Sequence, residues 1–426
     1  MGKKEPLLCL GKMFETSIGW DYFDPIRVRC TVTVDHNVDD ELIKKAWDRT
    51  KRVYPLIDAV PAYDHDFQVY LDPKTRGQYM NDHVYMVQAE SGVSDPVKSR
   101  VPVSPGTEAA GGRLVCVSYF GDTITFCTYH SLMDGSGANK VIQTFLYSYF
   151  ALYTGHEDEN PVVELREGRD LRDYYTVDIR DVIYKADYTP QPMYSLPLGC
   201  KGFMDADMVN DEHVYGANLH LHAPEFIGVC RKNGLNPSSL LCAVAAKAAY
   251  TVHPEEARDL VLSLTVSLKK FFERENDISN ALGLAHTCAT ADEIRKLPVT
   301  EVAKRMRKEL SSQLTKDYSS SFYRFVDTYQ VYHSVPKFNG RIVTYIGGLD
   351  IGENNHHIVN ARIESNSSNV LNMVQFNDTF SMMILYGQAT GKYQDVLVSF
   401  FRELGITTEI CAPVHYLQKG ADAAVL

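Results

Sequence analysis

The chain has 426 residues, of which 45% are hydrophobic and 23% charged, a length and balance typical of a globular protein with two domains of ordinary size. A net charge of −11 argues against a nucleic-acid partner, because such proteins normally carry a basic footprint. The sequence holds no apolar stretch long enough to predict a membrane span or a signal peptide, and its nine cysteines form no CxxC pair. We therefore expect a cytoplasmic protein whose cysteines are small buried hydrophobes.

The first third of the chain alternates between strand and helix signals. Residues 26–34 alternate as a strand, and residues 39–53 follow as an amphipathic helix, with Asp39 as N-cap and Pro55 after its end. Two short strands are predicted next, at 67–71 and 84–89. A loop rich in Ser, Pro and Gly spans residues 91–112.

The most informative segment is the HxxxDG motif formed by His130, Asp134 and Gly135. Two apolar runs, 114–120 and 123–128, flank Gly121-Asp122 and predict a β-hairpin that ends just before the histidine. Residues 138–153 carry apolar side chains at helical spacing. The motif therefore lies between a strand end and a helix start, where an exposed imidazole can meet a substrate. The alternative is a histidine at a strand end followed by an ordinary Asp-Gly turn.

Residues 155–212 are charged, aromatic and proline-bearing, and they predict a crossover between two halves. The second half again mixes strands and helices in a broadly similar order. Its predicted strands are 214–222, 260–268, 341–346 and a hairpin of 369–375 with 380–386; its predicted helices are 224–233, 240–252, 300–315 and 393–404. We divide the chain into an N-terminal lobe (1–155) with the motif, a crossover linker (156–212) and a C-terminal lobe (213–426).

These features together resemble the chloramphenicol acetyltransferase-like superfamily, which includes condensation domains and alcohol O-acetyltransferases. The helix ending in Tyr54-Pro55-Leu56 is similar to the family's first helix, and the central motif matches at His130, Asp134 and Gly135. The order of the weaker patterns also agrees. Asn236–Tyr250 resembles the helix that opens the second half, Leu264–Lys269 lies where many members carry Asn-Leu-Arg, and Thr344–Gly347 lies where many carry Ser-Asn-x-Gly.

The resemblance implies an α/β fold with mixed sheets, in which two similar lobes form a pseudo-dimer with an active-site tunnel between them. It also implies an acyltransferase that uses acyl-CoA as a cosubstrate and binds no permanent cofactor and no metal. The acceptor is a small molecule with a hydroxyl or an amine. A two-lobed chain can complete its site alone, so a monomer is expected.

The sequence departs from condensation domains at three positions. Their motif usually begins with two histidines, whereas the first position here is Tyr129, and Lys269 replaces an arginine. The arginine that follows the family's first helix is also missing, because that region reads Ile57-Asp58-Ala59. The chain therefore looks closer to free-standing alcohol acetyltransferases, with Tyr129, Lys269 and Thr344 as candidate substrate-binding residues.

Acyl transfer from a thioester requires an acceptor that loses a proton and an oxyanion that is held. His130 suits the first task, because an imidazole titrates near neutral pH. Asp134 is expected to turn inward, pair with a cation such as Arg27 or Arg29 and fix the loop that aims the imidazole; the alternative is an N-cap for the next helix. Gly135 permits close backbone approach, and its N–H lies at a helix start that favours negative charge.

Three other groups are weaker candidates. His220 and His222 share one strand face, but no further ligand lies near them in sequence, which favours a surface strand over a metal site. His356-His357 lies in an Asn-rich segment and is expected to face solvent. The basic helical residues Lys304, Arg305, Arg307 and Lys308 suit coenzyme A phosphates, although a solvated helix face is the commoner explanation.

Two alternative functions stay open. The acyl donor could be a thioester on an acyl carrier protein, as in free-standing condensation enzymes. The chain could also be a non-catalytic binding member of the same fold. The intact motif argues against the second alternative.

Overall fold

The computed structural model describes residues 8–10, 27–62, 84–88, 95–130, 132–168, 179–191, 213–329, 340–365, 370–386, 391–411 and 414–417. The chain forms two compact units, each built from several segments. Unit 1 combines Met1–Ala186 with two short segments from later in the chain, Phe272–Ala281 and Gly348–Ala361; the rest of the chain forms unit 2. The sequence-based division into continuous lobes did not include this exchange of segments. Among the described helices, none has the length and apolar character needed to cross a membrane.

A five-stranded mixed sheet carries the HxxxDG motif. Its order is β12-β2-β7-β6-β5, with bounds β2 (Arg27–Val34), β5 (Val97–Lys98), β6 (Val115–Phe120), β7 (Thr123–Tyr129) and β12 (Ile358–Ser365). Strands β6 and β7 form the predicted antiparallel hairpin, and Phe120 pairs with Thr123 at its turn. Gly121 opens the turn with φ of 60°, a left-handed conformation that glycine adopts without steric cost. A separate sheet, β1-β4-β3, is formed by Leu8–Leu10, Val84–Gln88 and Ala59–Ala62.

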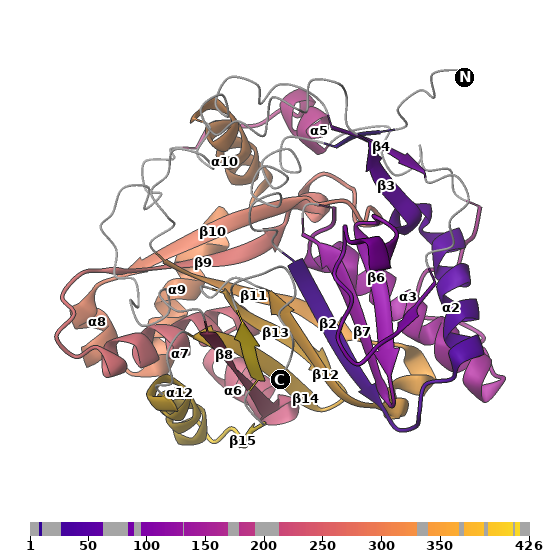
Figure 1. Ribbon diagram of the computed structural model, residues 1–426. Helices are drawn as coiled ribbons and strands as arrows, with labels where there is room; N and C mark the ends of the chain where they lie inside the picture. Colours follow the sequence, from indigo (N-terminus) through magenta and orange to yellow (C-terminus); the bar gives the residue numbers. More distant parts are fainter. Residues whose placement is uncertain are drawn as a thin grey trace. The chain divides into compact units, whose positions relative to one another are not determined.

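Helices α2 (Asp40–Val53) and α3 (Gly135–Thr154) lie beside this sheet (Figure 1). Asp39 caps α2 as predicted, since its carboxylate accepts the backbone N–H groups of Glu41 and Leu42 at 2.8 and 2.9 Å. The Trp47 ring of α2 contacts the rings of Phe145 in α3 and Phe126 in β7, with centroids 5.5 and 6.4 Å apart. This buried tryptophan packs α2 and the middle of α3 against β7 of the sheet.

The sheet of unit 2 has eight strands, with order β10-β9-β11-β13-β14-β8-β15 and β16 also paired to β8. Strands β9 and β11 pair in parallel. The pairs β9–β10, β13–β14, β8–β14, β8–β15 and β8–β16 are antiparallel. The bounds are β8 (His213–His222), β9 (Leu260–Ser267), β10 (Leu282–Ala289), β11 (Gly340–Leu349), β13 (Val370–Phe376), β14 (Thr379–Tyr386), β15 (Thr408–Ile410) and β16 (Val414–Leu417).

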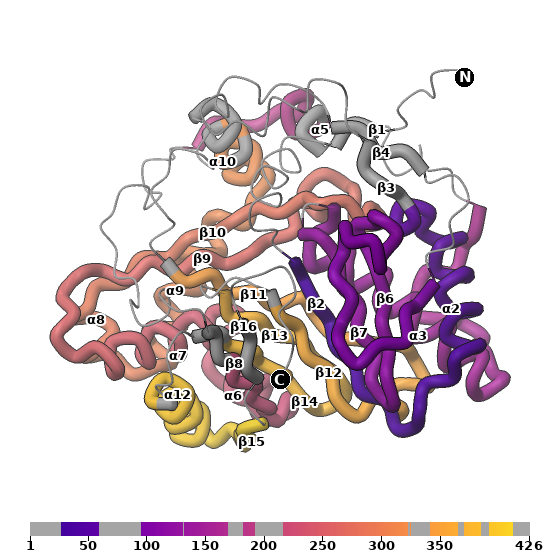
Figure 2. The backbone as a smooth tube through the Cα atoms, in the orientation of Figure 1, coloured from indigo at the N-terminus to yellow at the C-terminus, as the bar shows by residue number. Residues whose placement is uncertain are grey.

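Helix α7 (Pro237–Val252) lies at the centre of the unit 2 core. Nearly all its residues are buried, and Asn236 and Ser239 form a capping box at its start. The other helices of the unit, shown as tubes in Figure 2, are α6 (Ala223–Asn233), α8 (Ala291–Lys296), α9 (Val299–Gln313), α10 (Lys316–Tyr329) and α12 (Gly391–Glu403). The crossover contains α5 (Ile179–Lys185), and short 3-10 turns occur at Pro55–Asp58, Glu108–Ala110, Leu268–Phe271 and Gly352–His357.

The structure confirms the predicted α/β class and most predicted elements within a few residues. The longest elements that the sequence did not predict are β10, α10 and β12; the shorter ones are β1, β3, β5, α5, α8, β15 and β16. The predicted strand at 67–71 lies outside the described residues. Strand β11 continues through Gly347-Gly348, where the sequence had predicted its end.

Candidate functional site

His130 follows the last residue of β7, as the sequence predicted. The Tyr129 N–H donates to the Leu114 carbonyl at 3.0 Å and completes the hairpin, and the Leu132 N–H donates to the Tyr129 carbonyl at 3.1 Å and turns the chain. The His130 ring is half-buried. Its Nδ1 is buried and makes no hydrogen bond within the described part of the chain.

Asp134 is 2% exposed and caps α3. Its Oδ1 accepts the Gly137 N–H at 2.8 Å and the Ser136 hydroxyl at 2.7 Å, and its Oδ2 lies 3.3 Å from the Ala281 N–H. A carboxylate at a helix start is stabilised by the helix dipole as well as by these donors. Asp134 is therefore the N-cap of α3, the second of the two roles that its sequence position allowed. The same contacts also fix the loop that follows His130. A cation partner for Asp134 stays a prediction; Arg27 donates to the Ser104 hydroxyl at 3.0 Å.

Residues 272–281, a segment that joins unit 1 from the second half of the chain, hold the motif in place. The Asn280 side-chain amide donates to the His130 carbonyl at 2.7 Å, and its backbone N–H donates to the Leu132 carbonyl at 3.2 Å. The Lys140 ammonium donates to the Glu275 carbonyl. We call residues 272–281 the clasp. Sequence reasoning missed it, because no local pattern marks a segment that contacts His130 from 150 positions later in the chain.

The close backbone approach expected at Gly135 occurs at Gly137 instead. A Cβ atom on Gly137 would lie 2.1 Å from the Ile278 carbonyl oxygen of the clasp, a distance that no side chain tolerates. Gly135 is the half-buried first residue of α3. Gly137, the first glycine after the motif, therefore lets the clasp reach the start of α3.

The predicted substrate-binding residues fall in both units. Tyr129 is half-buried in unit 1, and its hydroxyl packs against Gly106, where a Cβ atom would lie 2.6 Å away. Thr344 and Lys269 belong to unit 2. The Thr344 hydroxyl lies 3.0 Å from the Thr265 hydroxyl of the neighbouring strand β9, and Lys269 is 2% exposed in the turn that follows β9.

The basic face of α9 is engaged by other groups. Lys304 pairs with Glu301 at 2.7 Å, Arg305 pairs with Glu293, and Arg307 donates to the Gly234 carbonyl. These contacts lower the positive charge that the helix offers to phosphates. They favour the solvated-face interpretation of the sequence pattern.

The remaining histidine candidates have different outcomes. His222 is exposed and lies 3.4 Å from Glu225, as fits the predicted surface strand. The expectation that both His356 and His357 face solvent is wrong for His357, whose side chain is 13% exposed and contacts Asp35. A 3-10 turn places these two residues at the start of β12, where His357 turns inward.

The described cysteines are free, and the two in the core of unit 2 are unsuited to nucleophilic chemistry. Burial raises the pKa of Cys230 to about 11 and that of Cys242 to about 12, so both stay protonated at neutral pH. Cys116 and Cys127 face each other across β6 and β7. Their contact raises the pKa of Cys116 and lowers that of Cys127.

No protein-family model and no curated protein matches the chain at the level of sequence. Its structure does match solved structures. TRI101 of F. sporotrichioides, complexed with coenzyme A and T-2, has a TM-score of 0.64 at 9% identity over 95% of this chain and 99% of that chain. TRI3 trichothecene 15-O-acetyltransferase from Fusarium sporotrichioides has a TM-score of 0.59 at 11% identity, covering 93% and 95%.

The epimerization domain from the third module of tyrocidine synthetase B also matches, with a TM-score of 0.59 at 12% identity over 93% of this chain and 95% of that one. At such identities the likeness establishes the fold and no more. The chain has the chloramphenicol acetyltransferase-like fold, which confirms the resemblance drawn from the HxxxDG motif. This fold is shared with an acetyltransferase and with the epimerization domain of tyrocidine synthetase B.

Proposed function

We propose that the protein is an acyltransferase that moves an acyl group from acyl-CoA to a hydroxyl or amine acceptor, with His130 as general base. The observation that carries the proposal is the position of His130, at a strand end, with its backbone held by Asn280 and its Nδ1 edge buried. The fold, shared with a coenzyme A complex and a trichothecene 15-O-acetyltransferase, supports the reaction class.

Because Nδ1 of His130 is buried, we assign the proton transfer to Nε2. His130 Nε2 takes the proton of the acceptor while the acceptor oxygen or nitrogen attacks the thioester carbonyl carbon. The tetrahedral intermediate then collapses, the carbon–sulfur bond breaks, and the imidazolium returns the proton to the coenzyme A thiolate. A positioned general base contributes roughly 10²–10⁴-fold to such a step. No covalent acyl-enzyme is required.

Asp134 and Gly135 have supporting roles in this proposal. Asp134 is a positioning residue, because its carboxylate ties the turn after His130 to the start of α3 and to Ala281. The Gly135 N–H belongs to the first turn of α3, where unpaired N–H groups and the helix dipole favour a developing negative charge. Tyr129, Lys269 and Thr344 stay candidate substrate contacts.

The experiment is a thiol-release assay with acetyl-, malonyl- and longer acyl-CoA donors and a pooled panel of alcohols and amines. We expect acceptor-dependent release that falls at least about a hundredfold in His130→Ala. His222→Ala is the matched control, since it removes an exposed histidine of β8. Near-normal turnover of a folded His130→Ala protein would exclude the proposed role.

A carrier-protein donor is the second candidate, and the shared fold with an epimerization domain from a module of tyrocidine synthetase B supports it. Transfer from an acyl carrier protein, but not from free acyl-CoA, would establish it. Absence of transfer from both donors with every acceptor tested would favour a non-catalytic binding protein of the same fold.

A further inference from the structure

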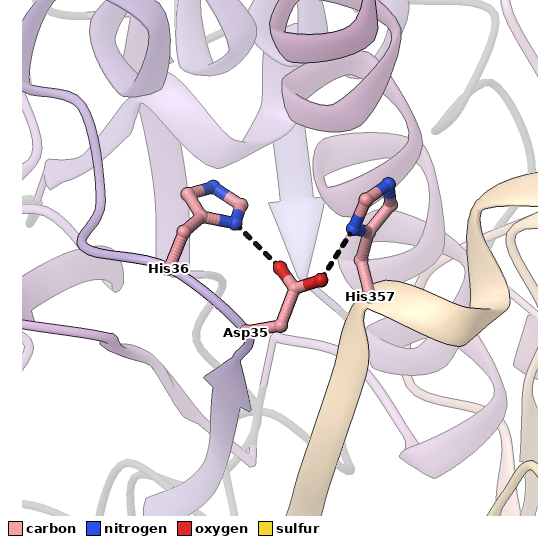
Figure 3. A group of neighbouring side chains, drawn as sticks. All are labelled: Asp35, His36 and His357. Atoms are coloured by element: carbon pink, nitrogen blue, oxygen red, sulfur yellow. Dashed lines mark hydrogen bonds and ion pairs between the residues drawn. The ribbon is translucent and has the colours of Figure 1, made fainter.

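Asp35, His36 and His357 bring three metal-ligating side chains together at the end of β2 (Figure 3). His36 Nδ1 lies 2.6 Å from Asp35 Oδ1, and His357 Nδ1 lies 2.8 Å from Asp35 Oδ2. All three ligand atoms lie within 4.8 Å of one another. Tetrahedral ligands on Zn²⁺ are separated by about 3.3 Å when Zn–N and Zn–O bonds are about 2.0–2.1 Å, so small side-chain rotations suffice.

Aromatic side chains of α3 fix the two imidazole planes. The His36 ring stacks on Tyr153 with centroids 3.8 Å apart and planes 5° apart, and the His357 ring stacks on Phe150 at 5.0 Å and 8°. The two imidazole planes are 87° apart, yet both Nδ1 atoms point at the same carboxylate. A site whose ligand rings are held by packing loses little side-chain entropy when it binds an ion.

An outer hydrogen bond also suits a metal-binding histidine. His36 Nε2 lies 3.0 Å from the Tyr149 hydroxyl, which also accepts the Asp39 N–H at 3.1 Å. Metal-bound histidines commonly donate their other ring N–H to such a partner, which sets the tautomer and orients the ring. The hydroxyl oxygen has two lone pairs and can accept both N–H groups.

We propose that Asp35, His36 and His357 form a binding site for a divalent transition-metal ion, of which Zn²⁺ is the best match. Two imidazole nitrogens and one carboxylate are a donor set that Zn²⁺ favours, and three protein ligands leave a position for water. Asp35 is 41% exposed, whereas each imidazole is 13% exposed, so the ion enters from the carboxylate side. The bound ion joins the end of β2 to a residue 322 positions later in the chain than Asp35.

The competing explanation is a hydrogen-bonded tie, in which both imidazoles donate Nδ1–H to Asp35 and no ion binds. Hydrogen bonds alone explain the two short distances. Hydrogen bonding alone, however, does not require both imidazole Nδ1 atoms to point at the same half-exposed carboxylate. The two explanations differ in a measurable way, because only a metal site binds Zn²⁺ stoichiometrically.

The test is isothermal titration of the metal-free full-length protein with Zn²⁺ at neutral pH, together with Co²⁺ absorption spectroscopy. We expect one ion per chain and the intense visible bands of four-coordinate Co²⁺. Asp35→Asn keeps the side-chain volume and a hydrogen-bond acceptor but removes the charged ligand, and it should weaken binding at least about a hundredfold. Tyr149→Phe removes only the outer partner and should weaken it about 10–100-fold.

Two controls separate this site from its neighbours. His356→Ala removes the adjacent exposed histidine and should leave binding unchanged. Glu353→Gln disables the second described group with metal-ligand geometry, formed by His156, Asp158 and Glu353, and should also leave binding unchanged. Binding that survives Asp35→Asn, binding lost in Glu353→Gln, or no stoichiometric binding to the wild-type protein would each overturn the proposal. The readout does not depend on acyl transfer.

Discussion

Gly137→Ala tests whether the clasp is essential to the motif. The added Cβ atom would lie 2.1 Å from the Ile278 carbonyl oxygen and 2.8 Å from its carbonyl carbon. Since carbon–oxygen contacts relax to about 3.3 Å or more, the start of α3 and the clasp must separate by roughly 1 Å. That separation breaks or lengthens the bonds from Asn280 to His130 and from Ala281 to Asp134.

The expected loss of stability follows from these contacts. Overpacking at a tight site costs roughly 1–3 kcal/mol. A weakened hydrogen bond to the Asp134 carboxylate costs about 1.5–3 kcal/mol. Alanine gains up to about 1 kcal/mol over glycine in helix propensity, which offsets part of the cost. The net expectation is a loss of about 2–4 kcal/mol in the free energy of unfolding, and acyl transfer should fall with it.

The matched control is Gly228→Ala in α6. Gly228 is exposed within the helix, and a Cβ atom there meets nothing within 4 Å, so the substitution should stabilise the protein by about 0.4–1 kcal/mol. Urea unfolding of both variants, followed by the thiol-release assay, makes the comparison. If Gly137→Ala were as stable and as active as Gly228→Ala, the clasp would have no role in holding the site.

Three further changes test other contacts. Asn280→Ala removes the donor to the His130 carbonyl and should lower kcat about tenfold with little change in the KM for acyl-CoA, measured by steady-state kinetics. Asp58→Ala leaves the 3%-exposed Arg113 without its carboxylate at 2.7 Å and should cost about 3 kcal/mol in urea unfolding. Burial lowers the pKa of His286 to about 4, whereas a histidine in the unfolded chain titrates near 6.5. Below pH 6.5 the unfolded chain therefore binds a proton that the folded protein does not, and the free energy of unfolding should fall by about 3 kcal/mol as the pH drops to 4. This loss should be absent in His286→Asn.

The sequence predicted those parts of the fold that depend on local patterns. The hairpin before His130 followed from two apolar runs around Gly121-Asp122, and α2 and α7 followed from apolar spacing and from caps at Asp39 and Asn236. These signals act over a few residues, so one sequence suffices to detect them. The position of His130 at a strand end belongs to this class.

The missed elements lacked such signals. Helix α10 contains consecutive serines, Ser319–Ser321, and several aromatic residues, all weaker helix formers than alanine. Strand β12 follows Asn354-Asn355 and two histidines, a composition typical of a loop, and its place at the sheet edge comes from pairing with β2. The inward turn of His357 was missed for the same reason, because Asp35 lies far away in sequence.

Helix α3 contacts both the HxxxDG motif and the cluster of Asp35, His36 and His357. Its first turn holds the HxxxDG loop through Asp134, and its last turns hold His36 and His357 through Phe150 and Tyr153. Because twenty residues of α-helix span about 30 Å, the HxxxDG motif and the Asp35–His36–His357 cluster lie near opposite ends of this mostly buried helix. Each end also receives a segment from later in the chain, residues 272–281 at the first and residues 348–361 at the second. Unit 1 is therefore completed only by segments that follow parts of unit 2 in the chain. The rigidity of the loop that carries His130 depends on contacts that the HxxxDG motif itself does not encode.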